Sequence, residues 1–126
     1  MEQVPYSPTD YVALFFDLFE ASSDAVYITR VGDGVVFDAN DSALSLFGYT
    51  RAEAIGHSTL ELGLWANPKD RQTFIEAMHT EGRLRRYAIR LRTKWSEEFT
   101  LELSATPEQL RGEDVILGVG VLPRSA

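Results

Sequence analysis

The sequence predicts a single α+β domain, from three observations in chain order. Residues 24–56 read as a strand, a tight turn and a second strand, which lead into two very short helices. Residues 67–82 carry the start and stop signals of one longer helix. Residues 86–122 carry three strand patterns, the last of them apolar throughout. Strands and helices that occur in separate runs are typical of an α+β sheet covered by helices.

Composition sets limits on the function. A chain of 126 residues suits one domain, and 44% hydrophobic with 25% charged residues is ordinary for a soluble globular protein. The absence of cysteine excludes disulfides, thiolate metal sites and cysteine nucleophiles. A net charge of −7 argues against non-specific nucleic-acid binding, which depends on neutralising phosphates. No apolar run approaches the ~20 residues of a membrane span and no signal peptide is visible, so we expect a cytoplasmic protein.

The N-terminal part predicts a loose segment over residues 1–8 and a helix over residues 9–21, with Thr9 as its cap. Its apolar residues cover roughly 200° of the helix, wider than the ~100° stripe that one docking surface requires. Two interpretations follow. The helix is sunk into its own domain, or one side packs on the sheet and the other on a second copy of the chain. The second predicts a homodimer, with the interface candidates Val12, Leu14, Phe15, Leu18 and Phe19.

The next segment predicts a hairpin that ends in a capped helix. Residues 25–29 and 35–39 are β-branched and apolar, and Gly32-Asp33-Gly34 is a turn signal between them. Asn40 suits the N-cap of a short helix, because its side-chain oxygen can accept from the free N–H groups of the first turn. Gly48 suits the left-handed residue that ends this helix.

One more helical turn follows, with Thr50 and Glu53 as a capping box and Gly56 as its end. After an irregular stretch, Asn67 suits the N-cap of the longer helix and Pro68 its first residue. Gly82 closes this helix. Its apolar face consists of Phe74, Ile75, Ala77 and Met78.

Three strands complete the chain. Residues 86–92 and 98–105 alternate strictly, with an arginine row on one strand and a glutamate row on the other, which favours antiparallel pairing. Residues 115–122 are apolar on both faces, which is typical of a central strand covered on both sides.

These residues together resemble the PAS sensor family. The resemblance rests on the turn Asp33-Gly34, on Asn40 and on the Gly-Tyr-Thr-x-x-Glu-x-x-Gly run of residues 48–56. It continues through residues 61–65 and Asp70-Arg71 into the last strands, and covers roughly residues 20–122. It implies a five-stranded antiparallel sheet in the order 2-1-5-4-3, with short helices and one long helix on one face. The chain then divides into residues 1–8, 9–21, 22–122 and a tail, 123–126.

The resemblance also implies a sensory module of a larger bacterial-type signalling protein, such as a histidine kinase of a two-component system or a cyclic-dinucleotide enzyme. A ligand or partner would favour one arrangement of the long helix against the sheet, and the N-terminal helix and last strand would pass the change to an output domain. The alternative is a ligand-free homodimerisation scaffold with a filled core. One departure from the family is that Gly120–Ala126 stands where an Asp-[Ile/Val]-Thr motif often leads to the output.

The pocket is expected between the long helix and the sheet. Asp38 is unusual because it falls within an otherwise apolar strand: it points into the pocket, or a bulge or the strand end turns it to solvent. The pocket candidates are Val26, Ile28, Val36, Asp38, Leu44, Phe47, Trp65, Phe74, Met78, Tyr87, Leu101 and Val119.

No cofactor or catalytic set stands out. His79 lies at the edge of the long helix and His57 in a loop, so neither is expected to bind haem or a metal. Flavin-adduct chemistry in this family needs a cysteine, which the chain lacks, and non-covalent flavin binding is an unfavoured alternative. The serines lack a nucleophile motif, and phosphate-loop and zinc spacings are absent, so we expect no enzyme. The pocket is expected to hold an unknown small molecule or none. Trp95, at a hairpin tip, either marks a contact with a partner domain or folds back over the core edge.

Overall fold

The structure is a computed structural model that describes residues 8–124, with side chains from residue 12 onward. Five antiparallel strands form one sheet in the order β2-β1-β5-β4-β3, which confirms the expected order with the last strand in the middle. The strands are β1 Ala25–Arg30, β2 Val36–Ala39, β3 Leu84–Arg92, β4 Glu98–Leu110 and β5 Glu113–Val121. The helices are α1 Pro8–Ala21, α2 Asp41–Phe47, α3 Arg51–Ala54 and α4 Asp70–Glu81.

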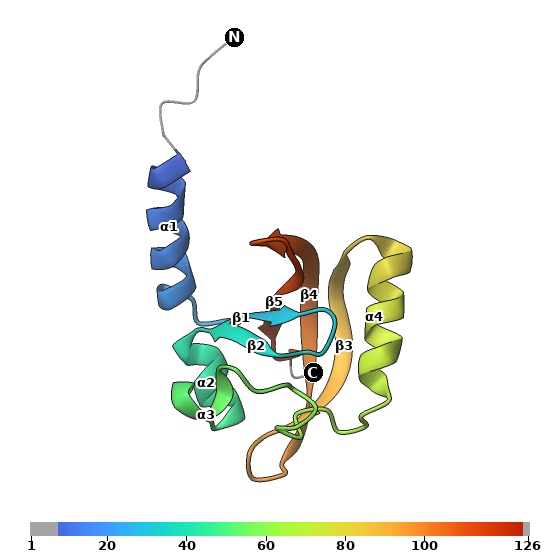
Figure 1. The fold of residues 1–126 in the computed structure, drawn as a ribbon. Coiled ribbons are helices and arrows are strands. Elements are labelled where there is room, and N and C mark those ends of the chain that lie inside the picture. The colour runs from blue at the N-terminus through green and yellow to red at the C-terminus, as the bar shows by residue number, and fades with distance from the viewer. Residues whose placement is uncertain (1–7, 125–126) are drawn as a thin grey trace.

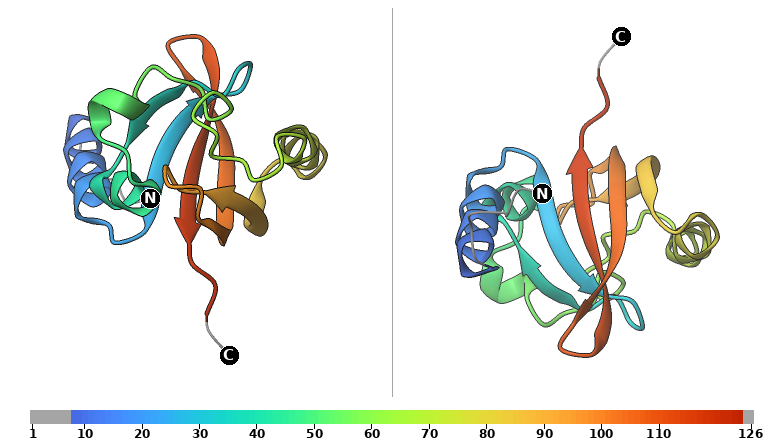
Figure 2. Two further views of the ribbon diagram at one scale, coloured as in Figure 1. Left: turned by 90° about the horizontal axis from the view of Figure 1, so that it is seen from below. Right: turned by 90° about the horizontal axis from the view of Figure 1, so that it is seen from above.

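The helices α2 and α3 lie next to β1 and β2, at one edge of the sheet. The helix α4 lies next to β3, at the opposite edge (Figures 1 and 2). The inner face of the sheet, between these helices, carries the core. Leu101, Leu103 and Ala105 of β4 are completely buried there, and Ile116 of β5 is nearly so. This arrangement leaves two separate helical covers, with the sheet curled between them.

Capping residues in the sequence determine where the short helices α2 and α3 begin and where α2 ends. Asn40 caps α2 by accepting from Ala43 N–H, and Gly48 ends it in the left-handed conformation. Thr50 and Glu53 form the expected capping box at α3. These short helices therefore begin where side chains replace the missing backbone partners of the first turn.

The start of α4 differs from the prediction. Asn67 is not the N-cap: its side chain accepts from Lys69 N–H and its carbonyl from Asp70 N–H, which makes a turn. Pro68 lies in this turn, and the helix begins at Asp70. An Asn side chain that bonds its own backbone two residues on competes with the cap, and here it delays the helix. The predicted end holds, because Gly82 follows with φ +82°.

The C-terminal strands are longer than expected. β4 runs to Leu110 and β5 starts at Glu113, so the two form a long hairpin closed at residues 111 and 112, both with positive φ. Facing rows of opposite charge hold β3 to β4, as predicted. The guanidinium of Arg86 lies 2.7 Å from a carboxylate oxygen of Glu102, and Arg90 lies 3.6 Å from Glu98.

The expectation that the last strand is covered on both faces holds only for part of its length. Gly118 and Gly120 of β5 are buried on one face; on the opposite face Val115 is buried, whereas Leu117 and Val119 are only partly buried. The end of this central strand thus carries partly exposed apolar residues on the outer face of the sheet.

The helix α1 does not cover the sheet, contrary to one expectation, and rises beside its β1–β2 end (Figure 1). It begins at Pro8, so Thr9 lies within it and not before it. Of the five interface candidates only Phe19 is buried, at 3% exposure, and it is therefore not free to meet a second copy. Val12, Leu14, Phe15 and Leu18 are between 42% and 69% exposed. Residues 1–7, 125 and 126 lie outside the described part.

Candidate functional site

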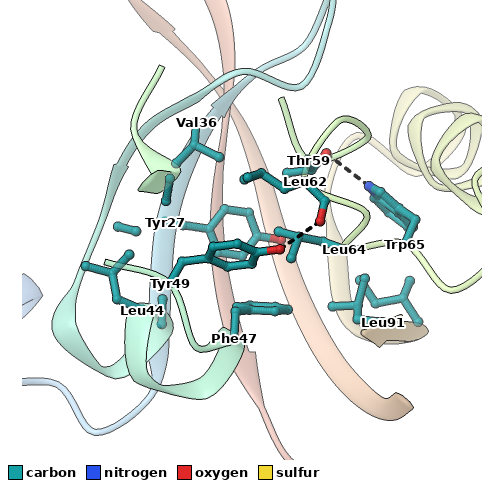
Figure 3. Close-up of a pocket in the computed structure, with 14 residues that line it drawn as sticks. Tyr27, Val36, Leu44, Phe47, Tyr49, Thr59, Leu62, Leu64, Trp65 and Leu91 are labelled. Atoms are coloured by element: carbon teal, nitrogen blue, oxygen red, sulfur yellow. Dashed lines mark hydrogen bonds between the residues drawn. The ribbon is translucent and has the colours of Figure 1, made fainter. Parts of the chain in front are cut away.

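A cavity of about 60 Å³ lies on the inner face of the sheet, beneath α2 and α3. Its walls come from β1, β2, α2, α3, the segment that follows α3, and β3 (Figure 3). The lining consists of Tyr27, Val36, Ala39, Ala43, Leu44, Phe47, Tyr49, Ala54, Thr59, Leu62, Leu64, Trp65, Ile89 and Leu91.

Small side chains explain why the space is here. Ala39 ends β2, Ala43 lies in the first turn of α2, and Ala54 lies in α3. All three are buried. A methyl group at each of these positions lets the two short helices lie over the sheet without filling the space between them.

Tyr27 enters the cavity because its cross-strand neighbour is a glycine. Tyr27 pairs with Gly118 of β5, and a Cβ added at Gly118 would lie 2.8 Å from Cζ of the Tyr27 ring. The ring therefore occupies the place of the missing side chain, and it points among the lining residues beside Tyr49 (Figure 3). Burial raises the pKa of the Tyr27 phenol, so it stays neutral and protonated.

The other polar groups of the lining are paired. The hydroxyl of Tyr49 donates to the carbonyl oxygen of Leu62 at 2.9 Å, and the indole N–H of Trp65 donates to Oγ1 of Thr59 at 3.0 Å. The lining contains no charged side chain. A charged ligand would lose its hydration without a partner, so the cavity suits a neutral one.

Four of the twelve predicted pocket residues line this cavity: Val36, Leu44, Phe47 and Trp65. On β1, the alternation is the reverse of the prediction. Tyr27 faces the helices, whereas Val26 and Ile28 lie on the opposite face together with Val119, the partner of Val26. The pairing register of β1 and β2 shifts between Ile28 and Thr29, so the ladder is irregular there.

Asp38 also lies outside the cavity. It pairs with Ile28 in the sheet, and its carboxylate lies 2.6 Å from a guanidinium nitrogen of Arg51. Its side chain is 39% exposed. Of the two interpretations, the one that turns Asp38 towards solvent is correct.

The remaining candidates lie in the packed core, with Phe74 and Met78 on α4, Tyr87 on β3, and Leu101 on β4 against Gly120. Phe74, Met78 and Leu101 are each at most 3% exposed and belong to one packed cluster. Tyr87 packs on Phe74, with ring centroids 5.9 Å apart. The prediction placed the pocket beneath the longest helix, but large side chains close that space.

Sequence reasoning missed most of the lining, including Tyr27 and Tyr49. The signal that could have found it was the set of small residues Ala39, Ala43, Ala54 and Gly118, because empty space collects where side chains are small.

Asn40 links the cavity to α1. Its Oδ1 accepts from the N–H groups of Val26 and Ala43, at 3.0 and 2.9 Å. Its Nδ2 donates to the carbonyl oxygens of Phe19 and Asp24, each at 3.0 Å. One fully buried amide thus holds the last turn of α1, the start of β1 and the first turn of α2 together.

The β3–β4 hairpin tip contacts the other end of α2. Lys94 N–H donates to the carbonyl oxygen of Phe47, and Lys94 Nζ lies 2.8 Å from a carboxylate oxygen of Glu53. The Trp95 ring packs on Gly48, where it would collide with an added Cβ, yet Trp95 remains 66% exposed. Trp95 therefore folds back onto the domain and still offers most of its ring to solvent.

Neither histidine lies in the cavity. His79 is exposed on α4, and His57 is exposed beside Glu61, 3.4 Å away. Within residues 8–124, no group of three acidic or histidine side chains could hold a metal ion. No helix of this part of the chain is long and apolar enough to cross a membrane.

The cavity does not fit the large cofactors of sensor domains. It is about one fifth of the ~300 Å³ at which pockets for drug-sized ligands begin. Haem and flavin are larger still, and the lining offers no histidine for iron. The residues present therefore do not form a site for either group.

Comparisons with known proteins agree with this architecture. Residues 23–122 match the model of a PAS domain family. A PAS domain of an HTR-like protein from Haloarcula marismortui is 22% identical, with a TM-score of 0.71 over 90% of this chain and 92% of that one. A domain of a sensory box sensor histidine kinase/response regulator from Geobacter sulfurreducens is 23% identical, with a TM-score of 0.73 over 93% and 98%.

A PAS domain from a two-component sensor histidine kinase is only 11% identical but has a TM-score of 0.75, over 91% of this chain and 98% of that one. No relative was found among curated proteins. The family match covers most of the chain, and the strand order and the placement of the helices agree with it. The chain belongs to the PAS domain family.

Proposed function

We propose that this domain is the sensory, non-catalytic module of a larger signalling protein, and that it responds to a small ligand or a partner by a shift in conformation. The observation that carries the proposal is the bonded path from the cavity to α1. Ala43 lines the cavity, its N–H is held by Asn40, and Asn40 also holds the last turn of α1. Ser42 Oγ adds a second link, donating to the carbonyl oxygen of Ser22 at 2.7 Å.

The signal would travel along this path. A molecule in the cavity that prefers one position of α2 changes the population of that position, and the bonds of Asn40 transfer the preference to α1. A ligand shifts the equilibrium only by its difference in affinity for the two states. The neighbouring structures named for sensor histidine kinases support an output of that class, with a cyclic-dinucleotide enzyme as the alternative output.

The test is hydrogen exchange on the purified chain under several atmospheres of xenon, a probe that enters dry apolar cavities. Xenon is expected to slow amide exchange in α2 and to change it in residues 19–22, while the β4–β5 turn at residues 111–112 stays unchanged. Xenon protection confined to α2, with α1 unaffected, would contradict signalling through Asn40.

The second candidate is a ligand-free homodimerisation scaffold, and the filled core beneath α4 favours it. Phe74 and Met78 of α4 are each 3% exposed and fill the space beneath this helix. A dimer seen by native mass spectrometry, with no bound molecule, no absorbance above that of its aromatic residues and no response to xenon, would support the scaffold.

Both candidates include a homodimer through α1. Val12, Leu14, Phe16 and Leu18 are each more than half exposed in the single chain, and apolar helix faces of this kind are rarely left to solvent. Replacing Phe15 and Leu18 with Glu is expected to give monomers by light scattering. Leu110→Glu is the control, since Leu110 is 43% exposed at the far end of β4 and should leave the dimer intact. A dimer that survives the double change would remove α1 from the interface.

A further inference from the structure

The outer edge of β3 is only partly covered by the rest of the described chain. β3 is the last strand on its side of the sheet. Beside the end of this strand, residues 64–66 pair with it in antiparallel fashion. Ala66 N–H donates to the carbonyl oxygen of Arg90 at 3.2 Å, and Arg92 N–H donates to that of Leu64 at 2.7 Å. The chain then turns away towards α4, so it covers the edge only as far as Arg90.

The next backbone groups along this edge are free. In an antiparallel ladder, alternate residues turn their N–H and C=O groups to the same side. Arg90 and Arg92 point to the outer edge, where they bond residues 64–66, so Ala88 points there as well. Within residues 8–124, no hydrogen bond is formed by the N–H or C=O of Ala88 or by the N–H of Arg90. Free groups of this kind are a template for pairing with another strand.

A groove of about 330 Å³ lies beside these groups. The helix α4 forms one wall of the groove and β3 the other, so α4 stands next to the free edge without closing it. Ala88 contributes only a methyl group and is itself exposed. The lining consists of Asp70, Thr73, Tyr87, Ala88, Ile89, Arg90 and Thr100.

The charges along β3 indicate what kind of strand would pair with it. Arg83, Arg85, Arg86 and Arg90 are all exposed. Arg86 and Arg90 form ion pairs with glutamates of β4, whereas Arg83 and Arg85 form none within residues 8–124. A second copy of β3 would place arginines opposite arginines, and like charges that face each other across a strand pair are destabilising.

An acidic strand would instead meet opposite charge. The net charge of −7 belongs to the whole chain. At physiological ionic strength, charges more than about 8 Å apart are largely screened. The arginines of β3 therefore decide the choice of partner locally.

We propose that the free edge of β3 binds an extended segment of a partner protein, which adds an antiparallel strand with acidic residues at alternate positions. One acidic residue lies opposite Ala88 and exchanges two backbone hydrogen bonds with it, with its side chain on the face of Arg90. The residues on either side of it face α4, where Asp70 and Thr73 favour hydroxyl groups. The inference goes beyond the proposed function and does not depend on the cavity.

The probe is the capped pentapeptide acetyl-Glu-Thr-Glu-Thr-Glu-amide, titrated into the ¹⁵N-labelled chain and followed by amide chemical shifts. The amides of Ala88 and Arg90 are expected to shift, while those of the β1–β2 turn at residues 32–34 stay unchanged. Because only a few exposed hydrogen bonds form, we expect a dissociation constant of the order of 1 mM. No shift at β3 at peptide concentrations of several millimolar would overturn the proposal.

Two N-methylated peptides test the backbone pairing without altering the protein. A methyl group on the amide of the central Glu blocks the bond to Ala88 and should weaken binding about tenfold or more. A methyl group on the amide of either Thr is the matched control, because that N–H points away from β3 and binding should hardly change. Equal binding by the two kinds of peptide would contradict strand addition. A peptide with lysine in place of every glutamate should bind at least tenfold more weakly, and equal binding would remove the acidic partner.

Ala88→Pro tests the same contact from the side of the domain. Proline is accepted on edge strands where its nitrogen faces outward, and here it removes the N–H and places its ring in the groove. Binding should weaken about tenfold or more, whereas Ala88→Val, which keeps the N–H, should bind as the unmodified chain does. The amide spectrum of each variant reports whether it is folded, and if Ala88→Pro is not, the N-methylated peptides decide. Unchanged binding by a folded Ala88→Pro would overturn the proposal.

Discussion

The two ends of the inner sheet face are packed in opposite ways. Under α4, aromatic and long aliphatic side chains interlock: Phe74 and Tyr87 have ring centroids 5.9 Å apart, and Met78 is only 3% exposed. Under α2 and α3, alanines at positions 39, 43 and 54 leave a cavity of about 60 Å³. The longest helix therefore covers a filled core, whereas the two short helices cover a small apolar cavity. Side-chain size, and not helix length, places the cavity.

The largest expected loss of stability comes from a substitution in the filled core under α4. Phe74→Ala should lower the free energy of unfolding by about 3–5 kcal/mol, because a buried ring is replaced by a void in a close-packed region. Leu44→Ala is the counterpart at the cavity wall. Leu44 is partly exposed and already borders empty space, so the loss should be about 1–2 kcal/mol. Urea unfolding measures both, and equal losses would show that the two ends are packed alike.

The second effect concerns the bonds that tie the cavity end to α1. Asn40→Ala removes the cap of α2 and leaves the buried N–H of Val26 without its side-chain partner, which should cost about 2–4 kcal/mol. It should also speed amide exchange at Ser22, whose N–H bonds Leu18 in the last turn of α1.

The control for Asn40 is Ser42→Ala. It removes one hydrogen bond, to Ser22, and should cost about 0.5–1.5 kcal/mol. If α1 exchanges at the same rate in Asn40→Ala as in the unmodified chain, Asn40 does not couple the helix to the cavity.

Much of this fold can be predicted from short-range chemistry. As helix caps, Asn40, Gly48 and the Thr50–Glu53 box bond residues within four positions, so the sequence alone indicates this role. The central place of β5 follows from its unbroken apolar run. These features depend on residue type and local spacing, and the structure confirms them.

The cavity could not be placed in this way. Val26, Tyr27, Ile28 and Thr29 are all good strand residues, so alternation alone does not tell which pair faces the helices. The glycine opposite Tyr27 decides it, and that partner is 91 positions further along the chain. Asn67 likewise suits either a helix N-cap or a turn. It forms the turn here because α4 begins later in the chain, at Asp70.

A third prediction tests the contact that positions Tyr27. Gly118→Ala would bring a methyl group to 2.8 Å from the Tyr27 ring, and the ring must move within the cavity. We expect a loss of about 1–3 kcal/mol, as for other overpacked cores, and a reduced response to xenon. Gly32→Ala is the control, since nothing lies within 4 Å of its added Cβ and the unfolding midpoint should hardly change. A fully stable Gly118→Ala variant with normal xenon binding would show that β5 does not set the ring position.

The smallest effect is electrostatic and concerns the hairpin tip beside α3. The hydrogen bond from Lys94, together with that from Thr50 N–H, lowers the pKa of Glu53 to about 2. The unfolded chain binds this proton near pH 4, so Glu53 contributes its full stability above that pH and loses it as the pH falls towards 2. Glu53→Gln should therefore show a shallower loss of stability between about pH 4.5 and 2.

Two features make this a sharp test of the tip. Asp33 behaves in the same way, because Arg30 lowers its pKa to about 2, so some acid sensitivity must remain in Glu53→Gln. Glu97→Gln removes a charge from the same hairpin without touching the Lys94 pair, and should keep the slope of the unmodified chain. Urea midpoints between pH 7 and 2.5 give these slopes. If Glu53→Gln and Glu97→Gln share one slope, the ion pair of Lys94 does not hold the tip against α3 in solution, and the tip is held by the bond from Lys94 N–H to Phe47 and by the packing of Trp95 on Gly48.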